Sequence, residues 1–277
     1  MKEVYLQLYS LFGDLDQDYQ GALRKIKEAG YSGVEFAQSN YGGMSPQELK
    51  SVLKEINLRP YSTHIRLGEL SETLPVAKEL EMPYIVIAGA YCYDSSSAQE
   101  VARQLNEAGA LCKRFGIQLG YHNHRGEFSK AENGKYLLDI LIENTDPDLV
   151  FFQMDVGWTV TAGIDWESYM DQYSGRFRLI HVKETTTDQL GPSKMHNPRE
   201  GYRDKEGNPE DFVTAVKKMR AERTWNTALG KGLIDWQRVK KVADAQGALA
   251  YIVEREHDYC GDIFACVKED ADYLLSL

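Results

Sequence analysis

Residues Leu119–Phe128 read LGYHNHRGEF, and the fold is organised around this stretch. It opens as a short apolar strand and follows a helix predicted at Ser97–Phe115, where apolar residues recur about every 3.6 positions. Side chains alternate along a strand, so His122 and His124 face the same side, and Glu127 lies in the loop just beyond. Imidazole and carboxylate groups together can bind a divalent metal or move protons. The alternative is a strand end with two hydrogen-bonded histidines.

Working outward, short apolar runs alternate with helical patterns along the whole chain. Leu149–Asp155 (LVFFQMD) is apolar without alternation, which is typical of a parallel strand buried on both faces. A doubly wound fold usually has a glycine-rich phosphate loop, and neither GxGxxG nor GxxxxGK[ST] occurs. The pattern predicts one (β/α)8 TIM barrel domain over residues 1–277. Its other strands are predicted at Val4–Tyr9, Gly33–Phe36, Pro60–Ile65, Tyr84–Ala88, Phe177–Val182 and Ala250–Glu254.

Helices are expected between these strands, and one long polar segment interrupts the pattern. Residues 185–227 follow the seventh strand, and we expect an excursion over the barrel mouth, either a lid or a solvated loop. The helices are predicted at Tyr19–Ala29, from Ser45-Pro46 onward, and at Glu69–Leu80, Gly134–Glu143, Trp166–Tyr173, Pro209–Ala221, Asp235–Ala245 and Phe264–Leu275.

Composition limits the function classes. A formal net charge of −10 over 277 residues argues against a nucleic-acid partner, which requires a basic face. The start of the chain, MKEVYLQLYS, predicts no signal peptide, and no window approaches the roughly 18 apolar residues of a membrane span. Four cysteines without a CxxC pair indicate a reduced setting. We therefore expect a cytoplasmic protein with a small-molecule substrate and no membrane partner, and a homo-oligomer is compatible with this composition.

Several predicted strands end in ligand-type residues. In a barrel these ends meet at one mouth, which is where active sites of this fold lie. Besides Leu119–Phe128, the third strand ends near His64, the sixth ends at Asp155, the seventh carries His181 and Lys183, and the eighth ends at Glu254. Asp155, His181, Glu254 and Glu127 would supply three carboxylates and one imidazole. Such a mostly oxygen site favours Mn, with Mg, Co or Zn also compatible.

Five motifs carry a resemblance to a known family. YHNHRGEF, MDVGW, HVKE, LGKGLIDW and YIVE, in this order, resemble the sugar phosphate isomerase/epimerase family of xylose isomerase-like barrels over nearly the whole chain. The resemblance implies Glu, Asp, His and Glu as metal ligands, and Asp155, His181 and Glu254 match the last three. Many relatives carry the first Glu on strand five, where this chain has His122. We expect Glu127 to be that ligand and His122 to be its neighbour, with the reverse as the alternative.

Two departures from the family pattern leave the substrate open. Relatives often read DxGH after strand six, whereas this chain has Trp158 in place of the histidine. Trp158 could stack on a sugar ring or pack as an ordinary aromatic side chain. The excursion at 185–227 is longer than in many relatives. The related endonuclease IV branch uses further histidines and a DNA-binding face, and the acidic charge and the missing histidines argue against it.

The resemblance implies chemistry next to a carbonyl group. A divalent ion on a carbonyl oxygen and the neighbouring hydroxyl stabilises an enediolate, so the adjacent proton becomes removable. We expect Glu254 or Glu127, with His122 or His124, to move that proton. The expected reaction is isomerisation or epimerisation of a keto- or aldo-sugar.

Other polar residues at the mouth are expected to contact the substrate. Lys183 and His64 would orient substrate oxygens, and the alternatives are a salt bridge at the rim and a core histidine. Arg255, Arg125 and Lys183 are candidates for a phosphate contact, but no basic cluster marks a phosphate pocket. A neutral sugar or keto-sugar is therefore favoured.

Two rival functions remain. The same proton abstraction could lead to loss of water from a keto-sugar or inosose, which would make the protein a dehydratase or lyase. A non-catalytic sugar-binding barrel would keep aromatic residues at the mouth without needing a full ligand set.

Overall fold

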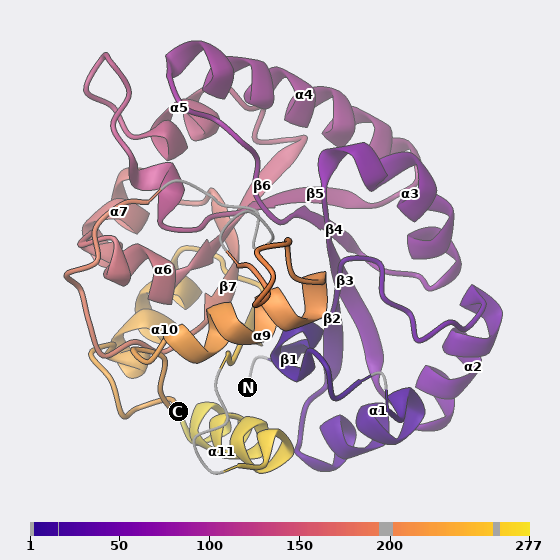
Figure 1. The fold of residues 1–277 in the computed structure, drawn as a ribbon. Helices are drawn as coiled ribbons and strands as arrows, with labels where there is room; N and C mark the ends of the chain where they lie inside the picture. Colours follow the sequence, from indigo (N-terminus) through magenta and orange to yellow (C-terminus); the bar gives the residue numbers. More distant parts are fainter. Residues whose placement is uncertain (1–2, 16, 194–201, 257–260) are drawn as a thin grey trace.

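Eight parallel strands close into a barrel surrounded by helices (Figure 1). The computed structural model describes residues 3–15, 17–193, 202–256 and 261–277. Strand β1 (Val4–Gln7) pairs with both β2 (Gly33–Ala37) and β8 (Ala250–Val253), which closes the barrel. The predicted (β/α)8 barrel is confirmed. The remaining strands are β3 (Arg59–Ile65), β4 (Tyr84–Ile87), β5 (Gln118–His122), β6 (Val150–Asp155) and β7 (Phe177–Val182).

The helix ends are set by local capping. Ser45 and Glu48 form a reciprocal capping box at the start of α2. The helix predicted from Gly134 begins only at Leu137, because Gly134 has φ +83° and forms a turn. Short α6, which was not predicted, begins directly after Asp155. The helices are α1 (Tyr19–Glu28), α2 (Pro46–Glu55), α3 (Leu70–Glu79), α4 (Ser95–Arg114), α5 (Leu137–Glu143), α6 (Val156–Thr161), α7 (Trp166–Gln172), α9 (Phe212–Glu222), α10 (Trp236–Ala245) and α11 (Ile263–Ser276).

The inside of the barrel is layered along its axis. Strand alternation places Phe151, Gln153 and Asp155 of β6 on one face, so the same face changes from apolar to polar along the strand. Gly120 leaves room for the Phe151 ring, which would lie 2.5 Å from an added Cβ. The apolar end of the interior consists of Tyr5, Val86, Phe151, Leu179, Ala250 and Ile252. The polar end therefore lies toward the carboxyl ends of the strands.

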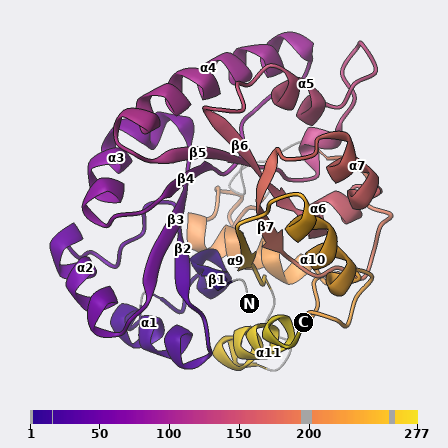
Figure 2. The same cartoon turned by 180° about the vertical axis from the view of Figure 1, so that it is seen from behind.

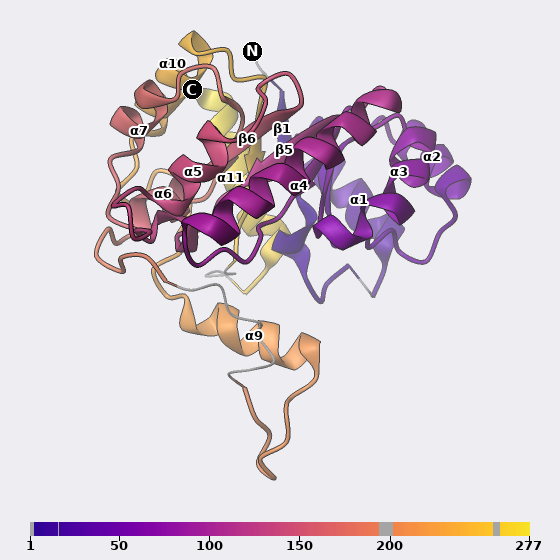
Figure 3. The same cartoon turned by 90° about the horizontal axis from the view of Figure 1, so that it is seen from above.

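Helix α9 lies over that carboxyl end and apart from the ring of helices (Figure 3). Its Arg220 donates to the backbone carbonyls of Tyr9, Ser10, Arg255 and Glu256, which follow β1 and β8. In the view from behind, the barrel lies in front of α9 (Figure 2). The excursion predicted at 185–227 thus contacts the mouth, although its residues 194–201 lie outside the described part.

Within the ranges that the structure describes, no helix is both long enough and apolar enough to cross a membrane.

Candidate metal and substrate site

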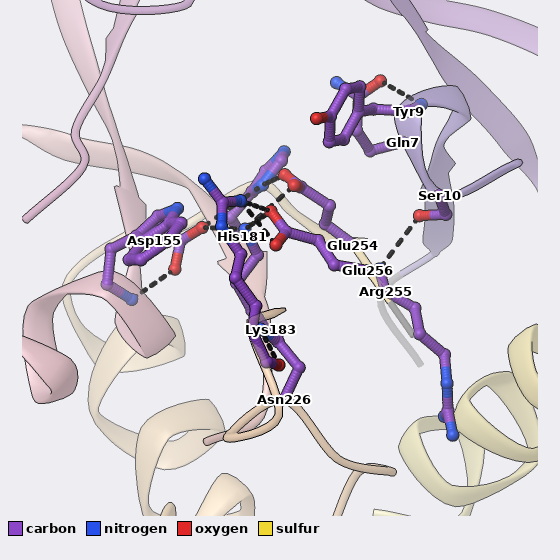
Figure 4. Close-up of polar contacts among 12 residues, drawn as sticks. Gln7, Tyr9, Ser10, Asp155, His181, Lys183, Asn226, Glu254, Arg255 and Glu256 are labelled. Carbon is purple, nitrogen blue, oxygen red and sulfur yellow. Dashed lines mark hydrogen bonds and ion pairs between the residues drawn. The ribbon is translucent and has the colours of Figure 1, made fainter. Parts of the chain in front are cut away.

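Four buried side chains from consecutive strands converge at the polar end of the barrel. His122 ends β5, Asp155 ends β6, His181 lies on β7 and Glu254 directly follows β8. One nitrogen or oxygen atom of each lies within 4.8 Å of the corresponding atom of every other. Figure 4 shows Asp155, His181 and Glu254 together, with Lys183 beside them. Two imidazoles and two carboxylates at this separation form a donor set that a divalent ion can bridge.

The two carboxylate oxygens of Asp155 have different roles. Its Oδ1 accepts a hydrogen bond of 2.7 Å from the Trp158 backbone nitrogen and so caps α6. Its Oδ2 is buried and has no hydrogen-bond partner among the described residues. Lys183 Nζ, His181 Nδ1 and His122 Nε2 lie 3.7, 3.8 and 3.9 Å from this oxygen. A buried carboxylate oxygen without a hydrogen-bond partner, close to the ring nitrogens of His122 and His181, is an arrangement that a metal ion between these groups would satisfy.

Gly157 explains the DVG spacing that brings Asp155 to the site. A Cβ at this position would lie 2.4 Å from the Lys183 carbonyl oxygen, so only glycine lets α6 pack this close to the end of β7.

Both candidate histidine ligands are oriented by buried partners. His181 Nε2 lies 2.7 Å from Glu35 Oε1, which can only accept, so this nitrogen carries the proton. Gln153 Nε2 donates to Glu35 Oε2 over 2.9 Å, so Gln153 Oε1 must be the group 2.9 Å from His122 Nδ1. These contacts leave His181 Nδ1 and His122 Nε2 directed toward Asp155. In metal sites such outer partners fix the ring orientation and the tautomer.

The Glu35 carboxylate on β2 is the shared acceptor of this hydrogen-bond network. Glu35 was not among the residues predicted from the sequence, and its side chain is fully buried. Burial opposes its ionisation, but the His64 and His181 rings hold the pKa of Glu35 well below its usual range. His64 Nε2 lies 3.0 Å from Glu35 and 2.7 Å from Gln153 Oε1. The other donors to Glu35 are Gln7 Nε2, Ser62 Oγ and Gln153 Nε2.

Lys183 is a fixed cation beside the four-residue group. Its Nζ lies 2.9 Å from Glu254 Oε1 and 2.9 Å from Glu256 Oε1. Burial favours the neutral amine, but Glu254 and Glu256 raise the pKa of Lys183 above its ordinary value. Lys183 can therefore orient or stabilise substrate oxygens, but it stays protonated and cannot act as a base.

Glu254 is held between two positive groups. Oε1 contacts Lys183, and Oε2 lies 3.1 Å from His181 Nδ1 without hydrogen-bond geometry. Burial opposes ionisation here too, but Lys183 and His181 keep the pKa of Glu254 well below its usual range. Burial would lower the pKa of His181, yet Glu35, Asp155 and Glu254 raise it. Glu254 is therefore ionised beside the positive charges of Lys183 and His181.

His124 is the imidazole beside the four-residue group that remains available to accept a proton. Its ring lies 4.8 Å from the His122 ring, and its Nδ1 is buried without a hydrogen-bond partner in the described ranges. Burial, with the nearby Lys183 charge, lowers the pKa of His124 to about 3, so the ring is neutral at pH 7.

Glu127 does not join the four-residue group. Its Oε1 accepts from the Tyr121 hydroxyl over 2.9 Å, and its Oε2 accepts from the His124 backbone nitrogen over 3.0 Å. Glu127 also lines a cavity of about 100 Å³ with Tyr91, Cys92 and other residues, and no member of the four-residue group lines this cavity. Burial raises the pKa of Glu127 to about 7. The structure thus brings His122, and not Glu127, together with the other three expected ligands.

The expected substrate-contacting residues are placed differently from one another. Trp158 is 4% exposed, and the cations of Lys183 and Arg223 pack against its ring. Lys183 Nζ lies 4.5 Å from the centre of that ring. Arg255 points away from the mouth toward α11 (Figure 4), where it forms an ion pair with Asp270 at 2.6 Å. Arg125 donates to the backbone carbonyls of residues 190 and 191. Trp158 and Lys183 border the site, whereas Arg255 does not reach it.

Comparison with known proteins identifies the family. The model of the xylose isomerase-like TIM barrel matches residues 23–277. The chain belongs to this family. An inosose dehydratase of Clostridium perfringens is 29% identical over 181 residues, which are 65% of this chain and 54% of that protein. An inosose dehydratase of Halalkalibacterium halodurans is 33% identical over 168 residues, covering 60% and 45%. The chain thus spans about half the length of these curated relatives.

Solved structures agree with the xylose isomerase-like fold. A sugar phosphate isomerase/epimerase from Parabacteroides distasonis superposes with a TM-score of 0.77 at 25% identity, covering 98% of this chain and 93% of that one. The IolI protein with a bound zinc atom shares the fold, with a TM-score of 0.73, 11% identity and coverage of 99% and 97%. The resemblance drawn from the sequence motifs is confirmed at the family level.

Three residues of this xylose isomerase-like site escaped the sequence analysis. Glu35 is a single acid within the apolar run GVEF, and Gln153 is a single amide within LVFFQMD, two positions before Asp155. Glu256 lies two positions beyond Glu254. For Gln153 the spacing of two was a usable signal, because it places this residue on the same face of β6 as Asp155. Glu35 has no candidate ligand two positions away, so no such signal marked it.

Proposed function

We propose that this protein is a divalent-metal-dependent enzyme that removes a proton next to the carbonyl of a keto- or aldo-sugar or a derivative, as an isomerase or epimerase. The observation that carries the proposal is the arrangement around Asp155 Oδ2. This oxygen is buried, lacks a partner among the described residues, and faces the ring nitrogens of His122 and His181, whose other nitrogens are occupied.

His122, Asp155, His181 and Glu254 would hold the ion. A divalent ion held there would act as a Lewis acid and make the proton next to a substrate carbonyl removable. With His122 in place of a carboxylate, nitrogen and oxygen donors are equal in number, which moves the expected preference from Mn toward Zn or Co. The zinc in the IolI structure is compatible with this choice.

In this proposal His124 and Glu254 transfer the proton. His124 is neutral, and its buried Nδ1 has no partner in the described part of the chain, so it can accept a proton from a substrate carbon or hydroxyl. The ionised Glu254 can serve as the second acceptor. Lys183 carries a fixed charge that would orient a substrate oxygen. Glu127, bonded to the His124 backbone nitrogen, would hold the loop that carries His124.

A dehydratase acting on a keto-cyclitol is the second candidate. The curated relatives reported above are inosose dehydratases, which specifically favours this alternative. Removal of a proton next to a carbonyl also begins β-elimination of water, so the same residues serve both reactions. The two candidates differ only in whether the proton returns to carbon or a hydroxyl group leaves.

A three-part experiment tests the proposal. Metal content is measured by elemental analysis of the wild type and of Asp155→Asn, in which Oδ1 still caps α6 while the charge is lost. Asp235→Asn, at the N-cap of α10, is the matched control for loss of a capping charge. We expect about one divalent ion per wild-type chain and per control chain, and none in Asp155→Asn.

Keto- and aldo-sugars and inososes are then incubated with the loaded enzyme in heavy water. Deuterium next to the carbonyl in recovered isomer or epimer supports the first candidate, and loss of one water supports the second. Absence of metal binding after addition of Zn, Co and Mn, together with absence of exchange, would overturn the proposal in favour of a sugar-binding barrel.

A further inference from the structure

The two departures from the family pattern, Trp158 and the long excursion, meet at one residue. Arg223 directly follows α9 at the end of the excursion helix, and its guanidinium lies 4.9 Å from the centre of the Trp158 ring. Lys183 Nζ lies 4.5 Å from the same ring centre. Both contacts are cation–π interactions, in which the negative faces of the indole ring attract a positive charge, and such interactions are stronger when they are buried.

Arg223 also reaches the carboxylates of the site. Its Nη1 donates to Glu256 Oε1 over 2.6 Å and to Glu256 Oε2 over 2.5 Å. Glu256 Oε1 also accepts from Lys183 over 2.9 Å, and Lys183 contacts Glu254. Arg223, Glu256, Lys183 and Glu254 therefore form a continuous chain of alternating charge from the excursion to a candidate metal ligand.

The position of Arg223 depends on how α9 docks. Arg220, three residues earlier, donates to four backbone carbonyls after β1 and β8. The backbone of Thr185 pairs with Asn226, which ties the far end of the excursion to the end of β7. Arg223 is thus fixed from both sides.

We propose that Arg223 is a positioning residue that couples docking of α9 to the geometry of the substrate site. Arg223 contacts Trp158 directly and positions Lys183 through Glu256. The inference rests on the proposed function, because that function defines the substrate site. Without Arg223, Glu256 keeps Lys183 as its one cationic partner among the described residues, and Lys183 can turn away from Glu254 and the mouth. A merely structural ion pair would change stability alone.

The test compares Arg223→Met, which keeps side-chain length, with Arg223→Lys, which keeps the charge but loses the two-oxygen contact. Arg238→Met is the matched control, because Arg238 pairs with Glu167 on the outside of the barrel. The first readout is the tryptophan emission of Trp158, obtained by subtracting the spectrum of each protein carrying Trp158→Phe. The second is kcat and KM for solvent hydrogen exchange by the metal-loaded enzyme.

We expect Arg223→Met to shift the Trp158 emission and to lower kcat about tenfold to a hundredfold, as misplacement of positioned groups does, with KM changing less. Arg223→Lys should recover part of both effects, and Arg238→Met should match the wild type. Glu256→Gln breaks the same chain from its other side. Combined with Arg223→Met, it should add little further loss of kcat.

An unchanged Trp158 emission in Arg223→Met, or an unchanged kcat despite a shifted emission, would overturn the inference. A wild-type enzyme without exchange activity would refute the proposed function alone, because the emission readout needs neither metal nor substrate. If Arg223→Met does not fold, Glu256→Gln must give the same two effects, and a wild-type result there counts against the role of Arg223.

Discussion

Replacing Glu35 with glutamine tests whether the buried network orients the metal ligands. Glu35 accepts hydrogen bonds at both oxygens, and its Oε1 lies 2.7 Å from His181 Nε2. In Glu35→Gln the amide oxygen can take the place of Oε1 and keep a hydrogen bond to His181, without the negative charge that raises the pKa of that ring. The amide nitrogen then faces Ser62, whose hydroxyl can rotate to accept, and Gln153 Nε2, which cannot.

The magnitude follows from that geometry. One buried donor, on Gln153, loses its acceptor, which costs about 1–3 kcal/mol of stability. Turning Gln153 over would restore that hydrogen bond but set its amide nitrogen against His122 Nδ1. Loss of an outer partner of a metal ligand typically lowers metal affinity 10- to 100-fold, and the retained hydrogen bond places Glu35→Gln at about tenfold.

Glu184→Gln is the matched control. Glu184 is also buried and accepts from four N–H groups, on Thr185, Gly230, Ile234 and Trp236, but none of these belongs to a candidate ligand. An amide there leaves two donors unpaired, for a loss of about 2–6 kcal/mol.

The two variants should therefore separate stability from metal affinity. Affinity for Zn and Mn is measured by competition with a chromophoric chelator, and stability by urea unfolding of the metal-free proteins. We expect Glu35→Gln to lose affinity with a modest loss of stability, and Glu184→Gln to lose more stability at wild-type affinity. Wild-type affinity in Glu35→Gln, or an equal loss of affinity in both variants, would refute the orienting role of Glu35.

Two further predictions concern residues that the structure places away from the four-residue group. Because burial raises the pKa of Glu127 from 4.5 to about 7, its contribution to stability is complete below pH 4.5 and is lost as pH rises through 7. Urea unfolding should show wild-type stability falling relative to Glu127→Gln by up to about 3 kcal/mol across that window, and parallel pH profiles would contradict this. Arg255→Met leaves Asp270 buried without its ion-pair partner and should cost about 3–5 kcal/mol at unchanged metal affinity; a loss of affinity at unchanged stability would instead place Arg255 at the site.

The period of the hydrophobic pattern explains why much of the fold could be predicted. Strand alternation and the apolar run of LVFFQMD depend on neighbouring residues alone, so they can be recognised without knowing what packs against them. Closure of eight parallel strands then brings the strand ends together, which is why Asp155, His181 and Glu254 were expected to converge. The helix start at Ser45 likewise follows from capping within four residues. The cap that Asp155 provides for α6 is equally local, but that helix was not predicted.

Hydrogen-bond partners across the barrel could not be predicted in this way. His181 and Glu35 are 146 residues apart in sequence, and no local pattern indicates that β2 supplies the partner of a histidine on β7. Loop residues beyond the strand ends follow no regular alternation of side chains, so the sequence did not predict the direction of the Glu127 side chain. In the structure, the loop after β5 directs this side chain toward Tyr121.

The sequence by itself therefore determined the barrel, its family and the strand ends that carry the candidate ligands, because these depend on local periodicity and on the order of motifs. Only the tertiary structure decided that His122 rather than Glu127 completes the group, that Arg255 pairs with Asp270, and that Arg223 meets Trp158. Those outcomes depend on which buried charges find partners across strands and helices. Burial makes an unpaired charge costly, and long-range packing determines which partner is within reach.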